Sequence, residues 1–420
     1  MQSVTFIHAA DLHLGAPFKG LRALSPQWAD VLLRAIPAAY ERVVDAAIEN
    51  KVDFVVIAGD SFDDTRPSYA DFSVFVAGLK RLNEAGIPVY FINGNHDPFT
   101  SWNNDFDMLP PNVHLLGAQG PEFACYERDG QPIAFIGGRG YYNQAWPAGV
   151  DVSAGISRET AANELGKHAP FMIGLLHTGL DIDPTRSPVR PDNLLARDVD
   201  YWACGHIHQT RMLPGLENPR IAFAGSPQGR GTWETGKHGA LKVTLTQGAP
   251  NKVEFIATEQ VEWQRLRIDV SACQSVADVQ REIVAAQFAA NANSHCQRMI
   301  FRIMLTGRTA LHALLQRQVL EDLRIAVNDS YPFFFIDAVT SETQALQDRE
   351  ALRAEGLFPA VCFEQLDALR AESTELVSAL EQEFYERNLA LPKNLQQGLA
   401  SICDDAETLV LDLLGKEEAR

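Results

Sequence analysis

Seven side chains in this sequence have the types and the positions expected of metal ligands: Asp11, His13, Asp60, Asn95, His177, His206 and His208. Asp11 and His13 are separated by one residue, as are the last two histidines, so both side chains of each pair can face one point. Carboxylate, amide and imidazole groups together suit Mn²⁺, Fe²⁺ or Zn²⁺. The set therefore predicts a metal centre with nitrogen and oxygen ligands.

The ligand types also predict what such a centre would do. Two divalent cations bring four positive charges, and Asp11 and Asp60 would neutralise two of them. The charge that remains can lower the pKa of a bridging water and bind a phosphate. Each motif alone is weak, because Asn95 could belong to a simple turn and His206 could be a buried strand histidine. Five such motifs in order favour a site.

Short apolar runs precede these residues, as expected of buried strands that end at an active site. The runs cover residues 5–10, 52–58, 87–92, 171–176 and 201–204. Helical periods over 27–50 and 68–85 separate the first three runs, which predicts parallel strands. Later strands are expected at 221–224, 239–246 and 253–258 without helices between them. These predict a second, more antiparallel sheet that stacks on the first.

The expected fold class is therefore α/β, with two stacked mixed sheets flanked by helices over residues 1–260. The periodicity changes near Val261, and residues 261–340 are expected to form a small α/β capping domain. Only helical periods occur over 341–420, with apolar stripes on helices expected at 361–388 and 395–414. These stripes suit a partner protein, or alternatively they pack on each other and on the capping domain.

The composition excludes several other classes of protein. The chain has 420 residues, of which 46% are hydrophobic and 21% charged, as in soluble globular proteins. No apolar run has the length of a membrane span, and the N-terminus lacks the pattern of a signal peptide, so a cytoplasmic protein is expected. The six cysteines contain no CxxC pair and predict buried thiols.

Five segments together resemble a known family: D-L-H, G-D-S-F-D, G-N-H-D, L-H and G-H-I-H look like the signatures of the calcineurin-like metallophosphoesterase superfamily. Residues 225–230 (G-S-P-Q-G-R), followed by Glu234, narrow the resemblance to its DNA-repair exonuclease branch of the SbcD and YhaO type. The resemblance is specific over residues 1–260. It implies a metal-dependent DNA exonuclease or endonuclease that hydrolyses phosphodiester bonds with a water activated by two metal ions, with Mn²⁺ the expected ion.

The resemblance also implies a role for each residue. One ion would be bound by Asp11, His13, Asp60 and His208, and the other by Asp60, Asn95, His177 and His206. His96 matches the family's catalytic histidine, which contacts the scissile phosphate and assists the leaving group, and Asp97 would orient it. Three further residues are candidate substrate contacts, because their side chains could approach a phosphate or stack on a base: Arg139, Tyr141 and Arg230. The alternative is that they belong to ordinary surface loops.

The resemblance implies partners, and the metal site leaves alternative functions open. DNA and an SbcC-like ATPase of the SMC type are the implied partners, with a homodimer as a further expectation. Because fold and metal do not fix the substrate, two alternatives stay open: a phosphodiesterase or phosphatase for a small molecule or phosphoprotein, and a regulatory or scaffold subunit of an ATPase complex. The net charge of −18 predicts that the chain alone binds DNA weakly.

Overall fold

The computed structural model describes residues 2–17, 25–102, 108–117, 119–147, 149–183, 185–346, 354, 356–371, 373–387, 389, 406, 407 and 409. Contacts divide the chain into two units. The first consists of Met1–Leu266, Gln287–Arg302 and Asn328–Asp337, and the second of Arg267–Ala286, Ile303–Val327 and Ala338–Arg420. The predicted domain borders at residues 260 and 340 stay predictions.

The first sheet has the strand order β12-β11-β1-β2-β3-β4. Strands β1 to β4 are parallel, whereas β11 pairs antiparallel with β1 and β12 pairs antiparallel with β11. The elements of this half are β1 (Ser3–Ala9), α1 (Pro26–Glu49), β2 (Phe54–Ala58), α2 (Tyr69–Glu84), β3 (Val89–Ile92), a 3-10 turn η2 (Phe99–Ser101), β4 (Val113–Leu115), β11 (Gly239–Thr246) and β12 (Lys252–Ala257).

The second sheet has the order β5-β6-β7-β8-β10-β9 and is also mixed. Strands β6, β7, β8 and β10 are parallel, and the two edge strands β5 and β9 are antiparallel to their neighbours. Its elements are β5 (Glu122–Arg128), β6 (Gln131–Arg139), α3 (Arg158–Leu165), β7 (Phe171–His177), α4 (Pro191–Leu195), β8 (Tyr201–Gly205), β9 (Arg211–Leu213) and β10 (Ile221–Phe223).

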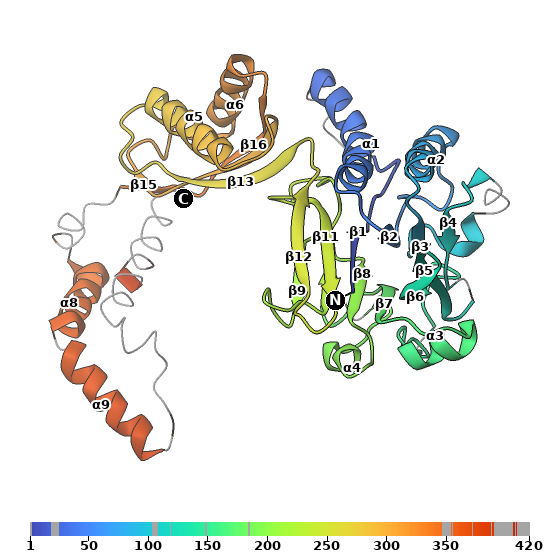
Figure 1. Cartoon of the computed structure of the whole chain (residues 1–420). Coiled ribbons are helices and arrows are strands. Elements are labelled where there is room, and N and C mark those ends of the chain that lie inside the picture. Colours follow the sequence, from blue (N-terminus) through green and yellow to red (C-terminus); the bar gives the residue numbers. More distant parts are fainter. Residues whose placement is uncertain are drawn as a thin grey trace. The chain divides into compact units, whose positions relative to one another are not determined.

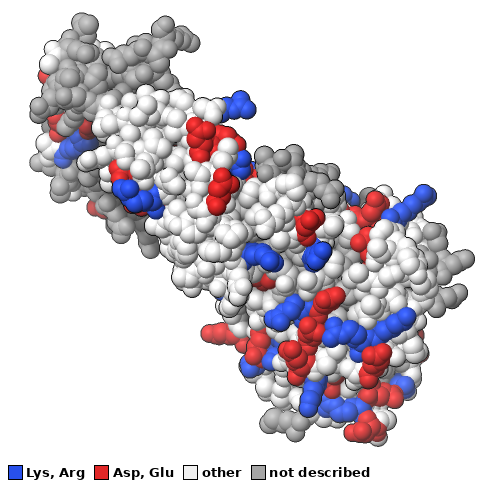
Figure 2. All heavy atoms as spheres, turned by 90° about the horizontal axis from the view of Figure 1, so that it is seen from above, with Lys and Arg blue, Asp and Glu red and all other residues white. Residues whose placement is uncertain are grey.

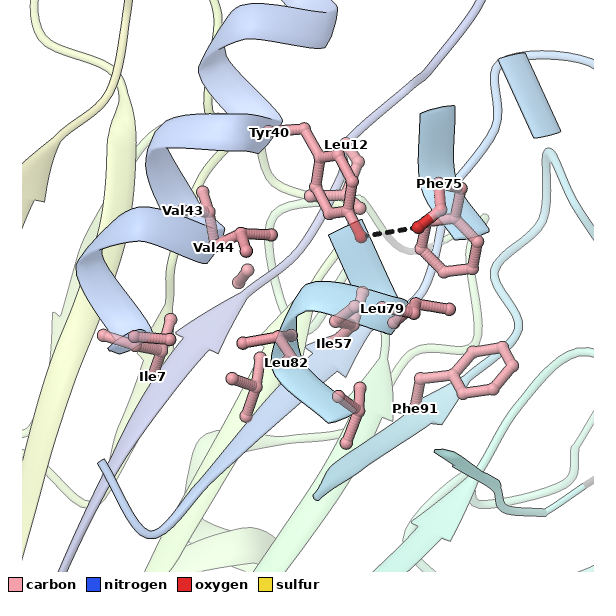
Figure 3. Close-up of a cluster of buried hydrophobic side chains, with 14 of the residues drawn as sticks. Ile7, Leu12, Tyr40, Val43, Val44, Ile57, Phe75, Leu79, Leu82 and Phe91 are labelled. Atoms are coloured by element: carbon pink, nitrogen blue, oxygen red, sulfur yellow. Dashed lines mark hydrogen bonds between the residues drawn. The ribbon is translucent and has the colours of Figure 1, made fainter. Parts of the chain in front are cut away.

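The two sheets pack face to face, with helices on both outer faces (Figure 1). Alternation along β1 decides the faces: Phe6 lies between the sheets, whereas Ile7 lies under α1 and α2. In the helix-covered core the Tyr40 hydroxyl donates to the backbone oxygen of Phe75, 2.9 Å away, and so joins α1 to α2 (Figure 3). The inner strands β2, β3, β7 and β8 are buried on both faces and almost wholly apolar, whereas the edge strands β5, β9 and β12 are only partly buried.

Local sequence signals begin the two long helices of this half. The side chain of Ser25 caps α1 by accepting from the Trp28 N–H, and Pro26 occupies the first helical turn. Ser68 caps α2 in the same way, accepting from Asp71 N–H. These caps fix where each helix starts, and hence the lengths of the loops that leave β1 and β2 for the site.

Later residues form smaller elements. A three-stranded sheet has the order β13-β14-β16, and β15 pairs with β17. Their bounds, with those of the nearby helices, are β13 (Glu262–Asp269), α5 (Val276–Ala292), β14 (Met299–Thr306), β15 (Arg308–Thr309), α6 (Arg317–Ser330), β16 (Phe334–Ser341), β17 (Gln344–Ala345), α8 (Leu357–Ala371) and α9 (Ser373–Glu386). Within the described residues, no helix is both long and apolar enough to cross a membrane.

Two stacked mixed sheets flanked by helices confirm the predicted fold class. The predicted assignment of strands to sheets was wrong in part: β11 and β12 extend the first sheet, and β10 joins the second sheet in parallel with β8. Strands β4, β5, β6 and β9 were not predicted. The helix predicted over 361–388 is divided between α8 and α9, and the one predicted over 395–414 lies almost entirely outside the described residues.

Candidate metal centre

The seven predicted ligands all stand at or just beyond strand ends, and they come from both sheets. Asp11, Asp60 and Asn95 follow β1, β2 and β3 of the first sheet. His177 is the last residue of β7, while His206 and His208 follow β8 in the second sheet. The backbone N–H of Asp11 donates to Gly59 O and that of His13 to Asp60 O, so the loops after β1 and β2 are joined. The site is therefore assembled at one end of the sandwich.

Backbone strain at this end of the sandwich occurs at several of the proposed ligands. Four of them have positive φ angles, namely Asp11 (51°), His13 (46°), Asp60 (50°) and His206 (96°). Left-handed backbone costs about 1–2 kcal/mol for most residues, although Asp tolerates it better. Such strain persists only where the surrounding structure imposes it, and it is a feature of functional sites. The loops thus turn abruptly so that the side chains point inward.

Two glycines make close packing around these ligands possible. A Cβ atom on Gly94 would lie 2.0 Å from Oδ1 of Asp60, and one on Gly59 would lie 2.4 Å from Nδ1 of His177. Neither position has room for a side chain. The G-D and G-N pairs of the sequence therefore have a steric cause, because each glycine leaves room for a ligand side chain of another loop.

The imidazoles of His13 and His208 face each other, with their Nε2 atoms 3.1 Å apart. Nδ1 of His13 lies 3.0 Å from Oδ1 of Asp63, and Nδ1 of His208 lies 2.7 Å from Oε1 of Glu234, closer than the 3.2 Å to Nη2 of Arg230. Both carboxylates favour the tautomer with the proton on Nδ1, which points two Nε2 lone pairs at one place. A cation between them removes that repulsion.

Asp60 occupies the middle of the cluster. Its Oδ2 lies 3.2 Å from Nε2 of His177 and 3.9 Å from Nε2 of His13, and its Oδ1 accepts from the His96 N–H at 2.9 Å. Oδ1 of Asn95 lies 3.2 Å from the same His177 nitrogen, whose ring is held from behind by Ala58 O at 2.9 Å. One Asp60 oxygen thus faces two histidines, as a bridging ligand must.

The electrostatics of the cluster call for positive charge. Burial alone would lower the pKa of His177, but Asp60 and Asp11 outweigh it and raise the pKa to about 9. Burial lowers the pKa of His13 to about 4, which keeps that imidazole neutral and able to bind a metal. The anionic oxygens therefore attract a cation, while at least one histidine has a free electron pair for it. The donor set fits two divalent ions.

Asp11 and His206 are joined through the main chain. The His206 N–H lies 3.0 Å from both carboxylate oxygens of Asp11. The His206 ring is held by Oδ2 of Asp183, 3.1 Å from its Nε2, so Nδ1 is the atom left for a ligand. Within the described residues, His/Cys/Asp/Glu atoms close enough to share an ion include the groups Asp11–His13–His208, Asp11–Asp60–His177 and His13–Asp63–His96. His206 and Asn95 extend these groups without belonging to them.

His96 lies beside the cluster with a half-exposed imidazole, 43% of which is accessible. Its Nδ1 lies 2.9 Å from the backbone oxygen of Asp63, which leaves Nε2 for a substrate. The prediction that Asp97 orients His96 was wrong: the Asp97 carboxylate accepts from the N–H groups of Gly94 and Ser61, both at 2.9 Å. Asp97 is buried and braces the loops after β2 and β3, because the carbonyl of Asp63 already holds the ring.

The three predicted substrate contacts have different environments. Tyr141 is 1% exposed, donates its hydroxyl to Ser187 Oγ, and packs edge-on against His177, so it supports the centre from inside. Arg139 donates to Asp151 O and lies over the Trp146 ring, 5.0 Å from its centroid. Neither matches the predicted contact with a base or a phosphate, because both are engaged within the fold.

Arg230 remains at the site. Its Nη1 lies 2.6 Å from Asp63 and its Nη2 3.3 Å from Glu234, the two carboxylates that hold His13 and His208. Asp183 had no signal in the sequence, because it belongs to no motif and lies six residues beyond His177. Asp63 and Glu234 stood within family-like segments, and a carboxylate partner for each ligand histidine is the signal that identifies them.

The comparisons with known proteins agree with this geometry. Residues 4–210 match the family model of the calcineurin-like phosphoesterases. Residues 263–344 match the model of the middle domain of metallophosphoesterase YhaO. The chain belongs to the calcineurin-like metallophosphoesterases.

Relatives of this metallophosphoesterase include YhaO and archaeal Mre11 proteins. The chain is 33% identical to the uncharacterized metallophosphoesterase YhaO of Bacillus subtilis over 279 residues, 66% of this chain and 65% of that protein. It is 27% identical to the DNA double-strand break repair protein Mre11 of Thermoplasma acidophilum over 274 residues, 62% of this chain and 65% of that protein. It is also 27% identical to the DNA double-strand break repair protein Mre11 of Methanococcus maripaludis over 226 residues, 53% of this chain and 56% of that protein. The chain thus spans less than two thirds of each relative.

Proposed function

We propose that this metallophosphoesterase is a nuclease that hydrolyses phosphodiester bonds of DNA, with two divalent cations, Mn²⁺ foremost, as its cofactors. The metal ligands are those predicted from the sequence: Asp11, His13, Asp60, Asn95, His177, His206 and His208. The similarity to Mre11 proteins, whose names state a role in DNA double-strand break repair, supports a nucleic-acid substrate.

One observation on this chain favours DNA over a small phosphate ester. A cavity of about 360 Å³ opens beside the centre and is lined by Asp63 and Arg230, with the aromatic residues Trp233 and Trp263 in its wall. Trp233 is 69% exposed, an unusual state for a tryptophan with no ligand to cover it. An exposed aromatic ring next to a cationic side chain, here Trp233 beside Arg230, can stack a base while the cation holds the neighbouring phosphate, whereas Trp263 is buried. A phosphate monoester alone would leave this wall unused.

The residues divide the work as follows. Cations bound at the centre would polarise the phosphate and supply a water that ionises near neutral pH. Asp63 and Glu234 fix the rings of His13 and His208, so these ligands need little reorganisation when a cation binds. His96 presents an accessible nitrogen beside the cluster, where it can donate a proton to the departing 3′-oxygen.

The experiment that tests this function compares three substrates with the purified chain and Mn²⁺. We expect hydrolysis of bis-p-nitrophenyl phosphate, little turnover of p-nitrophenyl phosphate, and cleavage of end-labelled DNA, all lost after chelation. Efficient hydrolysis of the monoester with intact DNA would instead favour the phosphatase alternative. Intact DNA and no turnover of either ester, with Mn²⁺ demonstrably bound, would favour the scaffold alternative.

Weak DNA binding by the isolated chain belongs to the same proposal. Residues 1–250 carry 20 basic and 27 acidic side chains, and residues 351–420 carry 6 and 14. On the face seen in Figure 2, basic and acidic side chains of the described residues are interspersed. Because counterion release from phosphates requires clustered Lys and Arg, the affinity would come mainly from a partner with a basic groove. We expect weak binding of a 30-base-pair duplex by an inactive variant, with a shallow salt dependence.

The proposed partner is an SbcC-like ATPase of the SMC type, and the helical region from residue 341 is its proposed docking site. In α8 the large apolar side chains Phe358, Val361 and Leu369 are exposed, which suits a protein interface. Deletion of residues 341–420 should abolish co-purification with the ATPase and leave hydrolysis of bis-p-nitrophenyl phosphate intact. A complex that survives the deletion would place the contact elsewhere.

A further inference from the structure

A second cluster of acidic and thiol side chains lies outside the candidate metal centre. Glu259 follows β12, Glu262 begins β13, and Cys296 lies in the loop between α5 and β14. Each offers one atom, and the three atoms lie within 4.8 Å of one another. All three side chains are buried, with 7%, 4% and 7% of their surface exposed. All belong to the first of the two compact units.

The backbone around the cluster holds the three side chains together. The Glu262 N–H donates to Arg298 O at 3.1 Å, and the Cys296 thiol lies 3.2 Å from the backbone oxygen of Glu259. Ser294 donates its hydroxyl to the Glu262 carboxylate, and its oxygen accepts from the Cys296 N–H at 2.9 Å. The start of β13 and the 294–298 loop are thus fixed to each other, and the cluster does not depend on mobile side chains.

The charges of this cluster are not balanced by the protein. Within the described residues, neither carboxylate oxygen of Glu259 has a hydrogen-bond partner, and neither Glu259 nor Glu262 forms an ion pair with Lys or Arg. A buried carboxylate without a partner is costly, and a second one nearby increases the cost. Proteins meet this cost by protonating the group, and burial raises the pKa of Glu259 to about 7, or by binding a cation.

The cluster also has an access route. A cavity of about 610 Å³ is lined by Glu259 and Cys296 together with Trp28, Arg42, His295 and Arg298. An ion that binds Glu259 and Cys296 would keep a coordination position toward this cavity, next to the exposed His295. Glu259 and Cys296 therefore line a space that admits ligands and water, while both carboxylate oxygens of Glu259 are themselves buried.

We propose that Glu259, Glu262 and Cys296 bind one transition-metal ion of the Zn²⁺ type, in a site that shares no residue with the candidate dinuclear centre. Thiolate and carboxylate ligands together suit Zn²⁺, Fe²⁺ or Co²⁺, whereas Mg²⁺ and Ca²⁺ prefer oxygen alone. Binding releases the Cys296 proton to solvent as the sulfur coordinates the ion. The site fixes the connection between the metallophosphoesterase fold and the YhaO-type middle domain, which begins at residue 263 by its family match.

Co²⁺ distinguishes this site from the dinuclear centre, because only a thiolate ligand gives a sulfur-to-cobalt charge-transfer band in the near ultraviolet. The seven proposed ligands of the centre include no cysteine. Titration of the metal-depleted full chain with Co²⁺ should produce this band, and its intensity at saturation should correspond to one thiolate-bound Co²⁺ per chain. Added Zn²⁺ should displace this Co²⁺ and remove the band. Absence of the band throughout the titration would overturn the proposal.

Substitutions identify the residues that give rise to the band. Cys296→Ser should abolish it, and Cys273→Ser, which removes another buried free thiol, should leave it unchanged. Glu259→Gln keeps the side-chain volume and should weaken Co²⁺ binding at least tenfold while the band's shape persists. Should Cys296→Ser fail to fold, as judged by circular dichroism, Glu259→Gln alone decides the assignment. A band that survives Cys296→Ser, or an unchanged affinity in Glu259→Gln, would contradict it.

Discussion

Asp63 and Arg230 form an ion pair at the metal centre, with Nη1 of Arg230 2.6 Å from Oδ1 of Asp63. The same Asp63 oxygen lies 3.0 Å from Nδ1 of His13, so one carboxylate positions both a ligand ring and a cationic side chain. The guanidinium of Arg230 partly neutralises the negative charge of Asp63, which would otherwise act on His13 alone. The strength of the histidine as a ligand therefore depends on where Arg230 points, toward Asp63 or toward a substrate phosphate.

Asp63→Asn should weaken metal binding without destroying the site. The neutral amide removes the negative charge that lies 3.0 Å from His13 Nδ1, and loss of such a partner costs roughly 10–100-fold in metal affinity. Calorimetric titration with Mn²⁺ measures this loss, and activity should recover as Mn²⁺ is raised. Asp64→Asn, which changes the exposed neighbour, is the matched control. Equal Mn²⁺ affinity in both variants would remove Asp63 from this role.

His13→Ala and His208→Ala should each lose one of two bound Mn²⁺ ions and all measurable hydrolysis. Their Nε2 atoms point at one place 3.1 Å apart, so removal of either ring leaves that position with too few ligands. Binding stoichiometry from calorimetry tests this directly. Retention of two ions per chain in both variants would show that the ligand assignment is incorrect.

His96→Asn should keep both metal ions and lose turnover of DNA by roughly two to four orders of magnitude, the usual contribution of an acid–base group. Bis-p-nitrophenyl phosphate should be affected much less, because nitrophenolate departs without a proton. The comparison of the two substrates separates proton donation from damage to the metal site. An equal loss on both substrates would point to a role of His96 in binding.

Trp233→Ala should impair hydrolysis of DNA selectively. Stacking of a base on an aromatic ring is worth about 1–3 kcal/mol, so we expect KM for a DNA oligonucleotide to rise roughly tenfold or more. Hydrolysis of bis-p-nitrophenyl phosphate should be unchanged. Tyr69→Ala removes a similarly exposed aromatic ring, 77% accessible, from the start of α2 and should affect neither substrate. A DNA KM equal to that of the parent chain would exclude stacking on Trp233.

Asp151→Asn should destabilise the protein at neutral pH but not in acid. Burial would raise the pKa of Asp151, but hydrogen bonds from Ser153 and the charge of Arg197 outweigh it and hold the pKa below its usual range. A depressed carboxyl pKa contributes stability above the unfolded-state value and loses it as the pH falls. The melting temperatures of parent and variant should therefore converge as the pH falls and Asp151 becomes protonated. Glu217→Gln, at an exposed position, is the control.

The sequence predicted which residues would gather at one place, because strand-end motifs carry the proposed ligands. Apolar runs ending at Asp11, Asp60 and His177 indicate where parallel strands release their last residues, and the structure brings those residues together. Periodicity could not place β11 beside β1, because antiparallel pairing on an edge depends on contacts more than 230 residues apart. Strand β5 was missed because its exposed and half-buried pattern lacks an apolar run.

Support residues were harder to predict than ligands. Asp183 holds His206 from a loop without any motif, and its role becomes visible only when the two side chains are 3.1 Å apart. The expected role of Asp97 beside His96 came from the family resemblance. Neighbours in a loop point in different directions, and Asp97 turns inward to the N–H groups of Gly94 and Ser61.

The origin of the proposed ligands in two different sheets has a consequence for the order of folding. Asp11, His13, Asp60 and Asn95 belong to one sheet, and His177, His206 and His208 to the other. An intermediate with a single ordered sheet would have only four or three of the seven proposed ligands, so neither ion would have its complete set. Metal capture would then follow the docking of the sheets, late in folding. Added Mn²⁺ would slow the unfolding of the mature protein and leave its folding rate almost unchanged.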